Sequence, residues 1–397
     1  MKRITYCFII FILLNFCIVD VAYGQTNTPS NEINNETFTI EDAENDIKIQ
    51  QLYDYMTEIQ SEYELLNDIS FKEYVDTYLK SGAGGLSVKG LLNIFIKYGL
   101  REISATLKIM STIIIISIIC ALIKNLESAF SNENLTNIAY FACYSVLIII
   151  LSKSFYIGVT LARETIVSMS DFMAALIPVL LMLLAGVGSI TEAAVLDPII
   201  IGTANISVKL FVDILLPIIG FSFVLVFVNN ITEDNKIENL TKLMKQIVLW
   251  IQGIIMTIFI GVITIRGISA NTIDAVAEKT VKFAVDNFIP IVGGALSDAI
   301  TTVAGYSLLI KNALSSLGLI VLIAIVLIPI IKLLVIALIY KLSAALIEPI
   351  SDKRLVRCVG AAGDSLILIT SCLISVSVMF FIMIAIVASA GKIILNG

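Results

Sequence analysis

The longest uncharged stretch near the end of the chain, residues 365–391, reads SLILITSCLISVSVMFFIMIAIVASAG. It exceeds the roughly 20 residues with which an α-helix crosses the hydrocarbon core of a bilayer. Other uncharged stretches occupy residues 109–123, 134–152, 172–191, 214–232, 246–265 and 312–331. Of the 397 residues, 58% are apolar or aromatic and 15% are charged, against about 45–50% and 25% in a soluble domain. The sequence therefore predicts an all-α polytopic membrane protein.

The composition also argues against an enzyme. The chain contains no histidine, which excludes imidazole as a base, a nucleophile partner or a metal ligand. No phosphate-binding loop of the Walker type occurs. The segment Ala361-Ala362-Gly363-Asp364 lacks the first glycine of an intramembrane aspartyl protease motif. The six cysteines have no C-x-x-C spacing and are interpreted as small core residues. We therefore predict no catalytic, cofactor-binding or metal-binding residue.

The N-terminus has the pattern of a secretory signal. Lys2 and Arg3 precede an apolar stretch over residues 4–19, and small residues follow at Ala22 and Gly24. This pattern predicts a cleavable signal peptide over residues 1–24, with an uncleaved first membrane helix as the alternative. In either case residues 25–85 form an extracytoplasmic head. That head is acidic, since residues 25–80 carry 13 Asp and Glu against three Lys.

Six apolar residues of the head recur at spacings of three and four and so share one helix face. We call this set the N-terminal stripe: Ile49, Leu52, Met56, Ile59, Tyr63 and Leu66. One partner for this face is the downstream segment around Phe71 and Val75, folded back as a helical hairpin. The other is a helix of a different protein. A glycine-rich break over residues 81–85 separates the head from an amphipathic interfacial helix and the first span, in residues 86–136.

The charges of the loops orient the remaining spans. Loops 229–246 and 341–357 are rich in Lys and Arg, and the positive-inside rule places both in the cytoplasm. Both loops can be cytoplasmic only if residues 172–208 enter and leave the membrane on the same side, as a re-entrant or bent hairpin. The residues expected to interrupt its helices, and so to act as hinges or line a pathway, are Pro178, Gly186, Gly188 and Pro198.

A second hairpin is predicted over residues 286–310 because an Ile-Pro pair recurs. Pro290 follows Pro178 by 112 residues, and Pro217 and Pro329 each come 39 residues after the first proline of their pair. Pro290, Gly293 and Gly294 are the matching candidates for hinges or pathway residues, and Pro217 and Pro329 are expected to kink their helices. The pattern predicts a parallel repeat of residues 137–245 and 246–350, followed by a basic loop and a last span in 351–397. About six spans, two hairpins and an outside C-terminus result, with a path or site between the repeats.

Charges at membrane depth are the usual pointers to function in such proteins. Lys209 and Asp213 lie four residues apart on one predicted span, where they can pair on one helix face. One interpretation is a structural pair near the membrane interface, in which the two charges neutralise each other. The alternative is an intramembrane polar pair that couples ion movement to transport.

Residues 91–397 carry several motifs that jointly resemble the stage III sporulation protein AE family of endospore-forming bacteria. The motifs are residues 175–178 (ALIP), 257–262 (TIFIGV), 287–293 (NFIPIVG), 307–312 (SLLIKN) and 339–345 (IYKLSAA). The resemblance implies a multi-pass protein of the mother-cell membrane around the forespore, within a secretion-like channel complex needed after engulfment. It implies as partners the other stage III sporulation A proteins, including ring-forming subunits and a cytoplasmic ATPase, and stage II sporulation protein Q. It implies neither a cofactor nor nucleic acid. A self-sufficient small-molecule permease and a scaffold without a pore remain alternatives.

Overall fold

The computed structural model describes residues 47–63, 66, 70–81, 88–130, 133–186, 190–231, 237–288 and 293–390. Within these ranges the chain is helical apart from short connections, and no strand occurs. The signal peptide, the acidic segment 25–46, Gly188 and Pro290 lie outside them.

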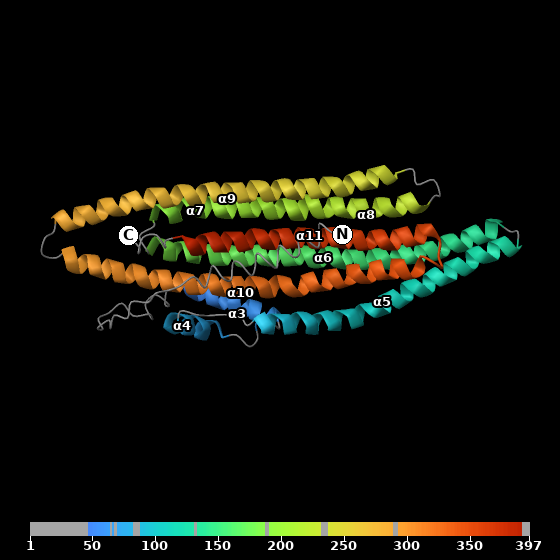
Figure 1. Cartoon of the computed structure of the whole chain (residues 1–397), viewed down its shortest axis with the longest axis horizontal. Coiled ribbons are helices and arrows are strands. Elements are labelled where there is room, and N and C mark those ends of the chain that lie inside the picture. The colour runs from blue at the N-terminus through green and yellow to red at the C-terminus, as the bar shows by residue number, and fades with distance from the viewer. Residues whose placement is uncertain are drawn as a thin grey trace.

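Two short helices precede a bundle of long ones (Figure 1). The short helices are α3 (Ile47–Glu62) and α4 (Phe71–Ser81). The bundle consists of α5 (Val88–Phe130), α6 (Glu133–Gly186), α7 (Ile190–Lys209), the π-helix η2 (Leu210–Leu215), α8 (Leu216–Ile231), α9 (Glu238–Phe288), α10 (Gly293–Ile347) and α11 (Lys353–Ser389). Helices α7, η2 and α8 run on as one rod, so the chain traverses the bundle six times in alternating directions.

Within the residues that the structure describes, six helical segments are long and apolar enough to cross a membrane, which confirms the predicted number of spans. They are Ile96–Ile123, Phe141–Gly186, Ile201–Asn230, Glu238–Ile265, Gly305–Ile347 and Lys353–Ser389. The 55 residues of α10 extend for about 80 Å at 1.5 Å per residue. Since the hydrocarbon core is about 30 Å thick, the bundle reaches far beyond one membrane surface.

Among the residues whose side-chain burial is described, which leave out 187–197 and 266–304, the exposed apolar side chains gather toward one end of the bundle. Most of them cover the part of each rod near the α5–α6, α8–α9 and α10–α11 connections: Leu107–Leu122, Phe141–Ile157, Phe221–Val228, Leu240–Ile265 and Leu338–Leu346. Beyond this belt, α6, α7, α9 and α10 continue to the opposite end, where the α6–α7 and α9–α10 turns lie (Figure 1). The basic segments 229–246 and 341–357 thus belong to one end of the bundle, as the positive-inside argument requires.

The helices continue through prolines at which the sequence predicts an interruption or a kink. Pro178 and Pro198 lie inside α6 and α7, and Pro329 lies inside α10. A proline removes one backbone donor, but a helix surrounded by others keeps its remaining hydrogen bonds and continues. The first hairpin therefore consists of the end of α6 and α7, and the chain reverses just after Gly186. Its two arms are continuous with the second and third spans, and α6 runs on through Pro178 without interruption.

At Pro217 the helix widens and does not stop. The π-helix η2 ends directly before α8, and the N–H of Leu216 bonds to the carbonyl of Phe211, five residues back. Proline has no N–H and its ring crowds the carbonyl four residues earlier, so a wide turn before it relieves both problems.

The repeat stays a prediction. Its two units correspond to α6 with α7–α8, and to α9 with α10. In the first unit α6 ends at Gly186 and α7 begins at Ile190, but residues 299–301, 112 positions after 187–189, lie inside α10. In the second unit α9 ends at Phe288 and α10 begins at Gly293, about ten residues before the position that the repeat predicts.

The N-terminal stripe faces the chain's own bundle. Ile49, Leu52, Met56 and Ile59 are buried, α3 contacts α6, and α4 contacts α10. The Tyr74 and Ser316 hydroxyls lie 2.9 Å apart between α4 and α10. The two short helices also meet where the Lys72 ammonium lies 5.9 Å from the centre of the Tyr53 ring. Docking of the stripe on another protein would first require its release from α6.

Candidate functional site

Polar contacts gather along α11, the last span. Asp352 caps the start of this helix, since its carboxylate accepts a 2.8 Å hydrogen bond from the backbone N–H of Arg354. A side-chain carboxylate at this position satisfies one of the unpaired N–H groups of the first turn and complements the helix dipole. The helix is then buried on one face along its length, and α6, α8, α9 and α10 all pack against it.

The contact nearest the basic connections is an ion cluster, which we call the Asp364 cluster. Lys341 of α10 places its Nζ 2.5 Å from one carboxylate oxygen of Asp364, and Lys245 of α9 lies 3.6 Å from the other. The three side chains are partly exposed, at 34%, 25% and 46% for Lys341, Lys245 and Asp364. One carboxylate thus joins three helices and leaves one positive charge in excess.

Gly363 lets α10 and α11 approach closely at this cluster. A Cβ at Gly363 would lie 3.2 Å from the backbone oxygen of Ala337 and 3.3 Å from Cγ of Lys341. Small residues commonly allow such approach between membrane helices. The approach brings the stem of Lys341 alongside α11, where its ammonium reaches Asp364.

Further along α11, a polar cluster forms around Gln252 of α9. The Gln252 side-chain nitrogen lies 3.1 Å from the backbone oxygen of Ser371, and 2.8 and 2.5 Å from the hydroxyls of Ser371 and Ser375. An amide nitrogen carries two hydrogens, so it donates to two of these three oxygens at a time. Gln252 is 8% exposed. Such hydrogen bonds hold membrane helices together where no water competes.

The far end of α11 is held by a buried cation. Lys311 of α10 is fully buried, and its ammonium donates to the backbone oxygens of Val387, Ala388 and Ala390. The last carbonyls of a helix have no partner within the helix and carry partial negative charge. Lys311 therefore caps α11 by both hydrogen bonding and electrostatics.

The predicted pair Lys209 and Asp213 does not join this set. Both side chains are exposed, on either side of the start of η2. The ion pairs recorded within the described ranges do not include one between them. Their part in ion coupling stays a prediction.

The predicted hinge residues lie in two places. Gly186 ends α6 against α10, since a Cβ there would lie 3.1 Å from Oγ and 3.5 Å from Cβ of Ser307. The two predicted hairpins, 172–208 and 286–310, thus touch each other. Pro198 is exposed on α7, while Gly293 and Gly294 begin α10.

The family model described as "Stage III sporulation protein AE" matches residues 69–391. The chain is also 32% identical to stage III sporulation protein AE of Bacillus subtilis (strain 168) over 394 residues, covering 99% of this chain and 98% of that protein. The chain belongs to the stage III sporulation protein AE family. No solved structure matches it.

Sequence reasoning missed most contacts of this family member's α11. Gln252 is a polar residue inside the uncharged stretch 246–265, and Lys311 separates two apolar runs, so both are unusual for a span. By sequence, Lys341 and Lys245 belong to the predicted basic loops, and Asp364 belongs only to the incomplete protease motif. Their meeting depends on how three helices rotate against one another. Within the described ranges no group of His, Cys, Asp or Glu gathers that could hold a metal ion.

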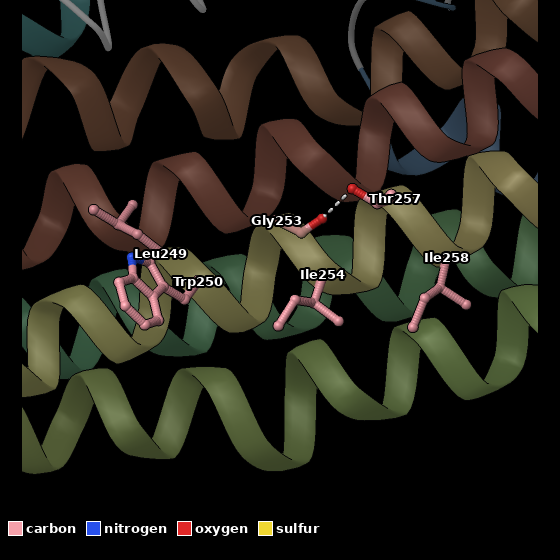
Figure 2. A pocket seen from close by; sticks show the side chains of 6 residues that line it. All are labelled: Leu249, Trp250, Gly253, Ile254, Thr257 and Ile258. Carbon is pink, nitrogen blue, oxygen red and sulfur yellow. Dashed lines mark hydrogen bonds between the residues drawn. The ribbon is translucent and has the colours of Figure 1, made fainter.

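Outside the polar contacts, this family member has a groove on the outer face of α9 (Figure 2). The groove is shallow and open, has a volume of about 520 Å³ and is lined by six residues of α9: Leu249, Trp250, Gly253, Ile254, Thr257 and Ile258. Trp250, Ile254 and Ile258 are 74%, 57% and 59% exposed. The Thr257 hydroxyl bonds to the carbonyl of Gly253 in its own helix, so the floor of the groove offers few free polar groups.

Proposed function

We propose that this chain is a non-enzymatic membrane subunit of the channel complex that connects mother cell and forespore during sporulation. The observation that carries the proposal is the family match over most of the chain, together with six apolar spans. In this proposal the chain lies in the mother-cell membrane around the forespore, with its N-terminal head in the intermembrane space. Its partners are the other stage III sporulation A proteins, including the ring-forming subunits and the cytoplasmic ATPase, and stage II sporulation protein Q.

The long bundle suits such a role. The part of the bundle beyond the exposed apolar belt is opposite the basic connections. In the proposed orientation it extends into the intermembrane space and offers partners a rigid platform. The polar contacts hold α11 to its neighbours from Asp364, near the basic connections, through Gln252 to Lys311 at the far end of the helix.

The first experiment tests membership of the complex. The tagged wild-type chain, expressed from its own promoter in its sporulating host, is purified from membranes solubilised in mild detergent after engulfment. We expect the other stage III sporulation A proteins to co-purify, and deletion of the gene to prevent heat-resistant spores. If deletion prevents spore formation but none of the other stage III sporulation A proteins co-purifies with the tagged chain, the channel-subunit proposal is contradicted.

A second experiment asks whether the two hairpins gate a path. Cysteines at Gly186 and Ser307 are placed for a disulfide, because a Cβ at Gly186 lies 3.5 Å from Cβ of Ser307 and disulfide-linked Cβ atoms are typically about 3.8 Å apart. If the hairpins separate during transport, oxidation of the Gly186→Cys/Ser307→Cys chain lowers spore yield, and a reductant restores it. The two single variants are the controls. Full cross-linking with normal spore yield would favour the scaffold without a moving gate.

A further inference from the structure

The groove on α9 lies between two ridges of side chains, each of which begins with a lysine. One ridge runs through Lys245, Leu249, Gly253 and Thr257, and the other through Lys242, Gln246, Trp250, Ile254 and Ile258. Residues four apart follow one another along a helix face. The apolar groove therefore leads toward Lys242 and Lys245, which lie nearer the α8–α9 connection.

The charges at this end of the groove are in positive excess. Lys242, 66% exposed, lies 2.7 Å from Glu238, and Lys245 lies in the Asp364 cluster with Lys341. Three lysines thus face two carboxylates. The Lys245 ammonium is partly exposed and lies 3.6 Å from the carboxylate oxygen of Asp364. An ammonium has three N–H donors, so it can also donate to a further anion.

The dimensions match one leaflet of a bilayer. From Leu249 to Ile258 the helix advances by about 14 Å, close to the half-thickness of the hydrocarbon core, about 15 Å. The two lysines lie one to two turns nearer the start of α9, at the level of headgroups. Trp250, beside them, has the interfacial position typical of tryptophan in membrane proteins.

We propose that this face of α9 is a binding site for one phospholipid with an anionic headgroup. The headgroup phosphate lies between Lys242 and Lys245, with Lys341 adding to the positive potential. One acyl chain fills the groove between Trp250, Gly253 and Thr257. Basic residues at helix ends on the cytoplasmic side are known to attract anionic lipids, and the groove supplies the apolar half of the site.

Trp250 provides a direct test, because it is the single tryptophan of the chain. The purified full chain is reconstituted in phosphatidylcholine vesicles in which a fixed minor fraction of lipid carries brominated acyl chains. The brominated lipid is phosphatidylglycerol in one sample and phosphatidylcholine in the other. We expect Trp250 fluorescence to be quenched more strongly by the brominated phosphatidylglycerol. Each lysine near the headgroups contributes about 1 kcal/mol, or about fivefold in local enrichment.

Variants identify the site. Lys242→Gln/Lys245→Gln is expected to bring the two brominated lipids to equal quenching, while Lys108→Gln, an exposed lysine of α5, leaves the difference unchanged. Gly253→Leu fills the groove and is expected to reduce quenching by both lipids; its Cβ meets no atom within 4 Å, so the helix tolerates it. Equal quenching by the two lipids in the wild-type chain would overturn the proposal. So would a preference that survives loss of both lysines, or weak quenching by both lipids, which would indicate that another protein segment covers this face.

Discussion

A single side chain, Lys311, carries a full positive charge into the interior of the bundle. Its ammonium has as partners two backbone oxygens of the last turn of α11 and that of Ala390, which directly follows the helix. Desolvation is therefore offset by hydrogen bonds and by the partial charge of the helix end. Replacing it by methionine keeps the length of the side chain but leaves these carbonyls buried without a donor. We expect Lys311→Met to lower the free energy of unfolding by roughly 1–3 kcal/mol.

Thermal unfolding in detergent, followed by circular dichroism, measures this effect. Lys108→Met, at an exposed site of α5, is the matched control and should unfold like the wild-type chain. A Lys311→Met variant as stable as the control would show that the cap contributes nothing.

Gly363 is the second residue on which the packing depends. A side chain there would meet the backbone oxygen of Ala337 at 3.2 Å, and a backbone atom inside a helix cannot move aside cheaply. We expect Gly363→Leu to separate α10 from α11 and to cost at least about 1–3 kcal/mol, as overpacking does. Gly220→Leu is the control, because a Cβ at Gly220 has no atom within 4 Å. The midpoint of thermal unfolding distinguishes the two variants, and similar midpoints would contradict the close approach.

At the scale of the elements, one amide and two hydroxyls join α9 to α11, in addition to the Lys245–Asp364 ion pair. Gln252→Leu removes the donor and keeps the apolar bulk, and we expect a loss of about 1 kcal/mol, the usual range for a hydrogen bond between membrane helices. The exposed Gln246 of the same helix gives the control, Gln246→Leu. A double-mutant cycle with Ser375→Ala measures the coupling itself. Additive effects of Gln252→Leu and Ser375→Ala would mean that the 2.5 Å contact is not energetically coupled.

For the whole molecule, the alternation of six traversals makes a prediction about topology. Asn239, near the start of α9, and Ser389, the last residue of α11, are both exposed and lie at opposite ends of the bundle. The positive-inside rule puts the end that contains Asn239 in the cytoplasm. In a chain whose own cysteines are replaced, we expect Ser389→Cys to react with an impermeant thiol reagent in intact cells. Asn239→Cys should react only after the membrane is opened, and the reverse pattern would invert the molecule.

The sequence by itself determined the all-helical membrane class, the number of spans and the family. These follow from the length of uncharged runs and from local motifs, which do not depend on contacts between distant residues. It also placed both basic loops at one end of the bundle. Only the tertiary structure decided that α6 continues through Pro178, because the surrounding helices stabilise a segment that local propensity would interrupt. It also decided which polar groups meet. Lys245 and Asp364 are far apart in the chain, and their contact depends on how α9, α10 and α11 rotate and slide against one another, which small residues such as Gly363 permit.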